Sequence, residues 1–528
     1  MGARTKGAAR SQVPGVRLKE VELSTVSSLG SRTTRSHVVP PLVQRPRARS
    51  RVMLVGCGPH SARTHLPFLS NCKEVELVAC VEVAGQVPAT ESALESFSQV
   101  TVMPVEPWTT PLMPGGTADM LSRVVQTERI DAVIIATEPL AHLAYLVWGM
   151  STGCHLFVDK PIVMLPGVAN DAAIARELDS VMRRLVTQAA RTPDRLVAVG
   201  TQRRYHAGLE LAKSLVVDAA ARFETPITSM ESSHADGQFR YPNELDFAYH
   251  GFVDGYGKLG HSGFHMIATQ ADLVAATAEA AGVTFDSFTT YASTVRPAGF
   301  LKQVPRTTYE RHFGRDVWTE ESPVLHADIA ERVSGYGEVD VDVINTFYSE
   351  GDAMLLSSIN LAHTSVSRRS ALKSNADLYK GNGRIKHEYH SFKVGPFIAV
   401  QVHSYQSRSK HDVLTGDERR AGGNDSMAVH VYRNADWYPT CMPELEVFTG
   451  DDIAHLAGMP AGKTFTGHAK ELMLGDFFAV VRGEKPVDLH RCPLDSHLLG
   501  GSMLSAAFES VASGSPVARE LGRTEVAR

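Results

Sequence analysis

Short, continuous apolar runs recur along the first part of the chain, at residues 52–55, 77–81, 132–136 and 156–158. Such runs are typical of strands that are buried on both faces of a parallel sheet. Longer segments with helical spacing lie between them, as at residues 140–151. This alternation of strand and helix predicts an α/β domain with a doubly wound parallel sheet.

After about residue 220 the pattern changes to strands without intervening helices. Residues 341–347 and 353–359 flank the turn-forming sequence Glu350-Gly351-Asp352, and this predicts an antiparallel hairpin. Residues 384–389 and 397–403 are further strand candidates. We therefore expect a C-terminal α+β domain with a large, mostly antiparallel open sheet.

Helical spacing returns over residues 472–481 and 498–511, so helices within 468–513 are candidates for packing back on the first domain. A polar, glycine-rich segment at 405–427 predicts a mobile loop. The expected division of the chain is a disordered basic tail over residues 1–50, a parallel-sheet domain over 51–200, and a substrate-binding and oligomerisation domain over 201–528.

The composition is that of an ordinary globular protein, with 43% hydrophobic residues, 21% charged residues and a net charge of -5. This charge gives no argument for a nucleic-acid or membrane-surface partner. The six cysteines are scattered, so neither a disulfide framework nor a structural zinc site is expected. No apolar stretch approaches the ~20 residues that span a bilayer, and the N-terminus lacks the apolar core of a secretory signal. The expected compartment is the reducing cytoplasm.

The first 50 residues differ from the rest because basic residues far outnumber the acidic Glu20 and Glu22. Such a segment cannot bury enough apolar surface to offset the entropy lost on ordering. The first interpretation is a disordered tail, or a segment that precedes the true start codon. The second is a basic arm for an anionic partner, or a targeting sequence. We favour the first interpretation.

The first predicted strand runs into a glycine-rich turn that has the form of a dinucleotide fingerprint. Its residues are Gly56, Cys57, Gly58, Pro59, His60 and Ser61. Gly56 permits a tight turn, Gly58 lets a diphosphate approach the backbone, and small Ser61 permits close helix–strand packing. Proline suits the first helical turn, where unpaired N–H groups attract phosphate.

The second predicted strand ends in Glu82, at the distance of roughly 20 residues where an acidic side chain grips the adenosine ribose. A carboxylate there would repel a 2′-phosphate, so NAD is favoured over NADP. The alternative interpretation is a tight turn followed by an unrelated surface glutamate. The position of the turn, between a predicted strand and a predicted helix, favours a Rossmann cofactor site.

Two further segments make the pattern specific: residues 130–139, followed by His142, and residues 153–161, which end in Asp159-Lys160-Pro161. Together with the glycine turn they resemble the Gfo/Idh/MocA family of glucose–fructose oxidoreductases and inositol dehydrogenases. In this family the corresponding peptide bond is often cis, so the resemblance implies a cis Lys160–Pro161 bond. It also implies that Lys160 lies beside the nicotinamide as a catalytic residue. Further residues near the cofactor by the same resemblance are Thr137, Glu138, Pro139, His142 and Asp159. Asp159 stands where the family has Glu.

A second family motif corresponds to residues 257–265, in which His265 matches the catalytic histidine and His261 replaces an aspartate. A histidine base suits proton exchange near neutral pH. Both residues are therefore candidates for catalysis and substrate binding; the alternative is two helix-packing histidines one turn apart. Arg204 is a candidate for substrate binding, or else a structural ion pair.

Residues Tyr249, His250 and Asp254 precede this motif and either line the substrate pocket or belong to an ordinary loop. A metal site is not expected. His261 and His265 have ligand spacing but no intervening glutamate, and residues 387–390 have the wrong spacing for a zinc helix.

The leading functional hypothesis is hydride transfer between NAD, with NADP as the alternative coenzyme, and a secondary alcohol or ketone of a sugar, inositol or related substrate. One alternative is a redox-neutral NAD-dependent glycosidase or epimerase, and another is a non-catalytic dinucleotide-sensing regulator. The expected partner is a carbohydrate-like small molecule, with no nucleic acid and no membrane. The family resemblance implies a homodimer or homotetramer.

Overall fold

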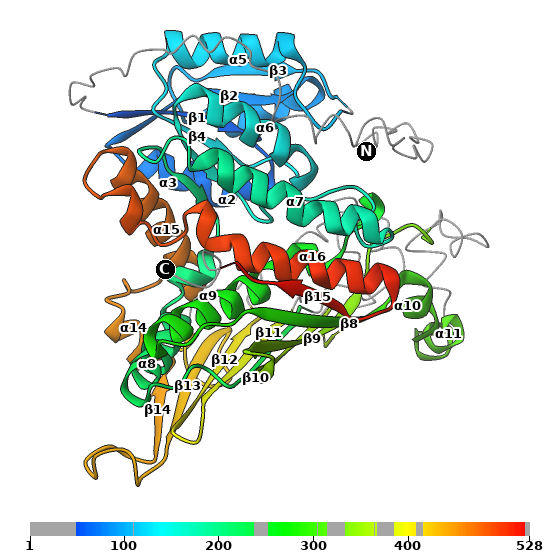
Figure 1. Ribbon diagram of the computed structural model, residues 1–528. Helices are drawn as coiled ribbons and strands as arrows, with labels where there is room; N and C mark the ends of the chain where they lie inside the picture. The colour runs from blue at the N-terminus through cyan, green and yellow to red at the C-terminus, as the bar shows by residue number, and fades with distance from the viewer. Residues whose placement is uncertain are drawn as a thin grey trace.

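The computed structural model describes residues 49–108, 110–236, 252–303, 305–313, 333–363, 365–366, 385–407 and 416–522. Nearly all of the predicted basic tail, together with Tyr249 and His250, lies outside these ranges, as does part of the predicted loop at 405–427. Figure 1 shows two sheets, one built from residues 50–199 and one from residues 229–520, with helices between them.

The N-terminal sheet has six strands in the order β3-β2-β1-β4-β5-β6, and every neighbouring pair is parallel. Its strands are β1 (Ser50–Val55), β2 (Val75–Val83), β3 (Thr101–Val105), β4 (Ala132–Ile135), β5 (His155–Val158) and β6 (Val197–Val199). The four apolar runs of the sequence are β1, β2, β4 and β5. Their side chains are buried on both faces, which confirms the doubly wound parallel sheet.

Helices cover both faces of this sheet. Those of the N-terminal part are α2 (Pro59–Arg63), α3 (His65–Asn71), α4 (Val87–Ala93), α5 (Gly115–Thr127), α6 (Pro139–Thr152) and α7 (Ala172–Ala189). Helices α5, α6 and α7 pack on one face, and α3 and α4 pack on the other. The second face is completed by α15 (Phe465–Val481), whose residues Met473 and Phe477 pack with Leu54 of β1 and Phe157 of β5. A C-terminal helix therefore forms part of the N-terminal core.

The second sheet has nine strands in the order β14-β13-β12-β11-β7-β10-β9-β8-β15. They are β7 (Ser229–Ala235), β8 (Ser287–Val295), β9 (Asp340–Ser349), β10 (Asp352–Ala362), β11 (Lys386–Val394), β12 (Ile398–Gln406), β13 (Asp425–Arg433), β14 (Leu445–Thr449) and β15 (Val517–Glu520). Only the β7–β10 pair is parallel, so the expected mostly antiparallel sheet is confirmed. The predicted hairpin joins β9 to β10 through Glu350 and Gly351, both with positive φ, as the mirror-image two-residue turns require.

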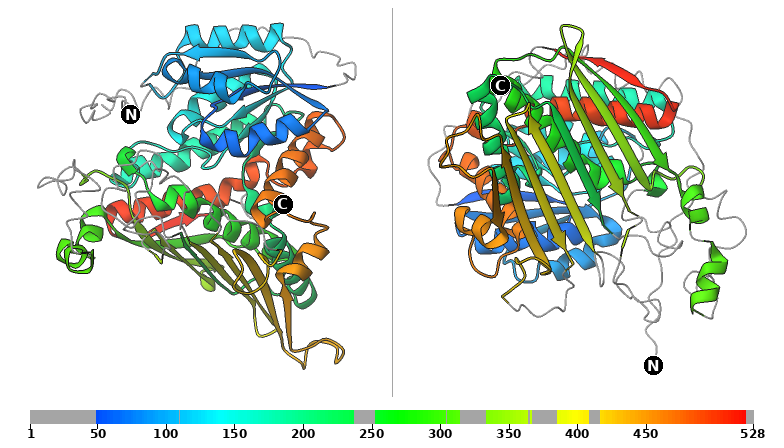
Figure 2. Two further views of the ribbon diagram at one scale, coloured as in Figure 1. Left: turned by 180° about the vertical axis from the view of Figure 1, so that it is seen from behind. Right: turned by 90° about the horizontal axis from the view of Figure 1, so that it is seen from below.

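One face of the nine-stranded sheet is covered by helices and the other is open. The covering helices are α8 (Ala207–Phe223), α9 (Phe264–Ala281) and α16 (Leu498–Ser513), with α10 (Pro297–Gln303), α11 (Arg306–Phe313) and α14 (Gly450–Leu456) at its margins. The right-hand view of Figure 2 shows the strands from the open side, with none of α8, α9 and α16 in front of them. Helix α16 is buried over most of its length because it packs on α7 of the first domain and on β8 of the second.

Within the described ranges, no helix has the length and apolar character that crossing a bilayer requires.

The packing of α15 predicts unequal effects of two substitutions on the same helix. Phe477 is fully buried and its ring meets that of Phe157 edge-on at 5.4 Å between centroids, whereas Leu472 is 44% exposed. Phe477→Ala is expected to lower the free energy of unfolding by about 3–5 kcal/mol, through lost burial and the cavity left behind. Leu472→Ala should change it by about 0.5 kcal/mol or less. Denaturant unfolding followed by tryptophan fluorescence measures both, and equal losses would show that α15 is not part of the core.

Candidate functional site

The turn between β1 and α2 is closed by backbone contacts that only glycine allows at its first position. Gly56 has a φ of +91°, and a β-carbon on it would lie 2.8 Å from the carbonyl oxygen of Ala136. A β-carbon on Gly58 would meet no atom within 4 Å, so the backbone there is approachable. The Ser61 hydroxyl donates a hydrogen bond to the Gly56 carbonyl at 2.7 Å, and Pro59 occupies the first turn of α2. These features fit a cradle for a diphosphate.

The carboxylate of Glu82, at the end of β2, lies against this turn. One oxygen accepts a hydrogen bond from the Cys57 N–H at 2.8 Å, and the other accepts from the Val83 N–H at 2.8 Å. A carboxylate has further lone pairs, so these two bonds leave acceptor capacity for ribose hydroxyls. The structure thus places Glu82 next to the phosphate turn. Cys57 takes part in this turn through its backbone N–H, and its side chain is buried.

His142 is fully buried and joins the two loops that flank the sheet edge. Its Nδ1 lies 2.8 Å from the Pro161 carbonyl oxygen, and its Nε2 lies 3.1 Å from the Thr137 carbonyl oxygen. Burial lowers the pKa of this imidazole. His142 is therefore a positioning residue that holds the loop after β4 against the loop after β5. In the first of these loops, Glu138 is the N-cap residue of α6 and Pro139 its first residue.

Lys160 follows β5 at the same edge of the sheet. The Lys160–Pro161 peptide bond is cis, as the family resemblance implies, and the Lys160 ammonium donates to the His261 carbonyl oxygen at 3.0 Å. Burial lowers the pKa of Lys160 to about 8, although the neighbouring charge of Asp159 acts in the opposite direction. The lysine can therefore exchange a proton close to neutral pH.

The two motif histidines lie on consecutive turns, and they have different surroundings. His261 belongs to a single π-helical turn over Leu259–Gly263, and its backbone carbonyl is the acceptor for Lys160. His265, on α9, is buried; burial first, and then the charges of Arg203 and Lys160, hold its pKa well below the ordinary value. The imidazole of His265 is therefore neutral near pH 7 and can accept a proton.

The sequence of the first domain matches a known family. Residues 50–184 match the Gfo/Idh/MocA model, which describes an oxidoreductase family with an NAD-binding Rossmann fold. Residues 50–184 form an NAD-binding Rossmann domain of the Gfo/Idh/MocA type. This match indicates an oxidoreductase that binds a nicotinamide coenzyme. No curated protein sequence matches the chain.

Three solved structures have a fold similar to that of this chain over most of its length. An oxidoreductase from Agrobacterium radiobacter, in complex with NAD+, L-tartaric acid and magnesium, has a TM-score of 0.52 at 11% identity, covering 89% of this chain and 98% of its own. GenD2 from gentamicin A biosynthesis, in complex with NAD, has a TM-score of 0.52 at 14% identity, covering 92% and 99%. The WlbA dehydrogenase from Bordetella pertussis, in complex with NADH and UDP-GlcNAcA, has a TM-score of 0.51 at 14% identity, covering 91% and 100%.

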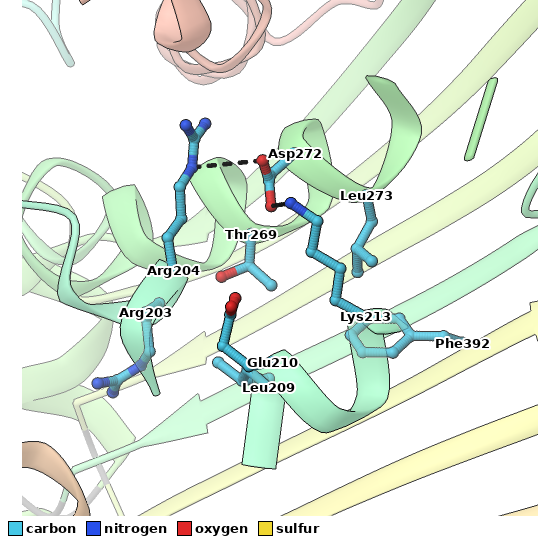
Figure 3. Close-up of a pocket in the computed structure, with 9 residues that line it drawn as sticks. All are labelled: Arg203, Arg204, Leu209, Glu210, Lys213, Thr269, Asp272, Leu273 and Phe392. Carbon is cyan, nitrogen blue, oxygen red and sulfur yellow. Dashed lines mark hydrogen bonds and ion pairs between the residues drawn. The ribbon is translucent and has the colours of Figure 1, made fainter. Parts of the chain in front are cut away.

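In this oxidoreductase Arg204 has the contacts of a structural residue. Its guanidinium donates to the Ser496 hydroxyl at 2.6 Å and carbonyl at 2.9 Å, and its Nε lies 3.5 Å from the Asp272 carboxylate. Asp272 also pairs with Lys213 at 2.6 Å. Figure 3 shows the small pocket that these groups line between α8 and α9, with the guanidinium groups of Arg203 and Arg204 pointing away from each other. These pairs support the structural ion-pair interpretation of Arg204.

The neighbouring Arg203 contacts the second sheet instead, and no sequence pattern pointed to it. It forms a two-bond pair with Glu388 of β11, at 2.9 and 2.5 Å, and both side chains are nearly buried. His390 lies 3.1 Å from the same carboxylate. The charge of Arg203 acts on both Lys160 and His265. Glu388 and His390 are two residues apart on β11, so their side chains lie on the same face of the sheet. This alternation could have indicated the pair, whereas the spacing of metal ligands on a helix could not.

Lys470 is a second site residue that the sequence did not reveal. It extends from α15 and donates to the Thr64 hydroxyl at 2.9 Å, at the junction of α2 and α3. Burial lowers its pKa to about 8, and the charge of Asp159 acts against this shift. A residue some 300 positions beyond Lys160 along the chain could be brought here only by the packing of α15 on the first sheet.

The position of Glu82 predicts how the enzyme distinguishes its two possible coenzymes. Glu82→Gln keeps an oxygen that can accept from the Cys57 N–H but removes the charge that would repel a 2′-phosphate. We expect the ratio of the NADP to the NAD dissociation constant to fall by about tenfold, equivalent to ~1.4 kcal/mol. Calorimetric titration with both coenzymes measures the ratio, with Glu91→Gln as a control for loss of an acidic residue outside the turn. An unchanged ratio would remove Glu82 from coenzyme selection.

Proposed function

We propose that this enzyme transfers a hydride between the nicotinamide and a secondary alcohol or ketone of a sugar, an inositol or a sugar-derived compound. The proposal is supported by the contact of the Lys160 ammonium with the His261 carbonyl oxygen, four residues before His265, and by the burial that lowers the pKa of both Lys160 and His265. A reacting hydroxyl at this place would find a donor and a neutral acceptor together.

In the oxidation direction, His265 takes the hydroxyl proton and the Lys160 ammonium donates a hydrogen bond to the same oxygen as negative charge develops on it. The bound nicotinamide supplies the hydride acceptor, so that the carbon–hydrogen bond breaks with its electron pair. In reduction the proton returns to the oxygen from this pair. Arg203, locked by Glu388, holds positive charge next to both groups and favours the neutral form of His265.

The substrate class rests on two supports. The site pairs a rigid arginine–carboxylate unit with buried histidines, groups that can both donate and accept hydrogen bonds to a polyol. In addition, the similar WlbA structure was solved with a sugar nucleotide. A screen of sugars, inositols and sugar nucleotides, followed by the absorbance of reduced nicotinamide, tests this part of the proposal. The proposal fails if none of these classes is oxidised while NAD binds.

The role of Lys160 gives a specific expectation for a variant. Lys160→Met should reduce kcat by at least about 100-fold, in the range of general acid–base contributions, and leave the NAD dissociation constant nearly unchanged. In the reduction direction the wild-type rate should fall as pH rises through about 8, because the ammonium form of Lys160 is lost. This decrease in rate above pH 8 should be absent in Lys160→Met. It should persist in Lys470→Met, although the pKa of Lys470 in the wild type is also about 8. Lys73→Met, at an exposed position in the turn before β2, is the neutral control, and full activity of Lys160→Met would exclude the lysine.

We also propose that a second copy of the chain covers the open face of the nine-stranded sheet. On that face Tyr291 of β8 lies opposite Ile344 of β9, and Leu356 of β10 lies diagonally from Ile344. These side chains are 43%, 53% and 59% exposed, a contiguous apolar group of the kind that marks an interface.

The proposed assembly can be tested by placing a charge in this apolar group. Ile344→Lys should convert an oligomer to a monomer in sedimentation experiments, because a buried lysine without a partner is costly. Leu456→Lys, at a 62% exposed position on α14, should leave the assembly intact. A wild-type protein that sediments as a monomer would contradict the proposal.

A further inference from the structure

Three metal-ligand side chains meet at the edge of the first sheet. His60 comes from α2 within the phosphate turn, His65 from α3, and Asp159 from the end of β5 immediately before Lys160. Their ligand atoms all lie within 4.8 Å of one another. In the described part of the chain this is the one such cluster of three, and neither His261 nor His265 belongs to one.

The spacing of the ligand atoms matches a small coordination sphere. Nε2 of His65 lies 3.1 Å from one oxygen of Asp159, and Nε2 of His60 lies 3.6 Å from the other. For bonds of about 2.0–2.1 Å around a tetrahedral zinc ion, adjacent ligand atoms are about 3.4 Å apart. The observed separations lie on either side of this value, so an ion could be bound with small adjustments of the side chains.

The surroundings hold two of the three ligands in place. The side chain of His65 is fully buried, its ring packs edge-on against Phe157 at 5.8 Å, and Asp159 is 13% exposed. The Asp159 backbone is anchored by a hydrogen bond from its N–H to the Ile135 carbonyl at 2.9 Å. His60 is 35% exposed, so the third ligand lies on the solvent side and provides a route of entry.

We propose that His60, His65 and Asp159 form a binding site for a divalent transition-metal ion, with zinc as the best match. Two imidazole nitrogens and one carboxylate oxygen are a ligand set that zinc accepts, and three protein ligands leave a fourth position open. Magnesium and calcium prefer all-oxygen sites and are disfavoured here. Histidine spacing along one helix does not reveal this set, because the three ligands come from three different elements.

The test is direct metal binding by the full chain without a histidine tag, stripped of metal and coenzyme. Equilibrium dialysis with Zn²⁺ gives the stoichiometry, and the visible absorption of Co²⁺ reports tetrahedral nitrogen and oxygen coordination. We expect one saturable equivalent. His60→Ala and Asp159→Asn should each weaken it by at least about tenfold, since even outer-shell partners of metal ligands contribute ~10–100-fold. Circular dichroism verifies that both variants are folded.

The matched control removes one histidine of another close pair. His403 and His430, on the open face of the second sheet, have ring centroids 5.1 Å apart, compared with 5.6 Å for His60 and His65. His430→Ala should retain the zinc equivalent. The proposal is overturned if the wild type takes up no saturable ion, or if His60→Ala and Asp159→Asn bind as the wild type does. Coenzyme binding by the metal-free wild type is a separate measurement, so this failure would leave the proposed hydride transfer standing.

Discussion

One row of backbone hydrogen bonds across the parallel sheet determines where the chemistry of this enzyme can occur. Gly56 donates to Val81, Ala136 to Val55, Asp159 to Ile135 and Gly200 to Val158, all at 2.8–2.9 Å. Each donor is the first residue after its strand. Because the strands are parallel, this row brings the phosphate turn, the loop of Thr137, the Lys160 loop and the segment leading to Arg203 to one edge.

The same edge is buried, and burial gives its side chains their chemistry. Lys160 and Lys470 lose part of their hydration, and the pKa of each falls to about 8. His265 lies beside cations and stays neutral. In water these side chains would have ordinary pKa values, so the site depends on helices α9 and α15 covering the edge of the sheet.

The two domains are joined by polar contacts as well as apolar packing. Arg203, just after β6, pairs with Glu388 of β11, and a chain of buried hydrogen bonds continues through His390, Ser232 and Gln270. Helix α16 fills the space between α7 and β8. A buried ion pair contributes little net stability but is costly to break, so Arg203 and Glu388 hold the second sheet in one orientation relative to Lys160.

The amino-acid sequence by itself determined the local features: the four apolar strands, the glycine turn, the β9–β10 hairpin and the position of Lys160 before a proline. These follow from residue-scale sterics and burial, which neighbouring residues encode. Only the tertiary structure decided that Arg203 pairs with Glu388 whereas Arg204 binds Ser496, and that His142 contacts two carbonyl oxygens. It also decided that Lys470 and the His60–His65–Asp159 cluster lie at the edge of the first sheet. Contacts between distant segments depend on how whole elements pack, and the spacing of residues along one segment carries no record of which other segment will lie against it.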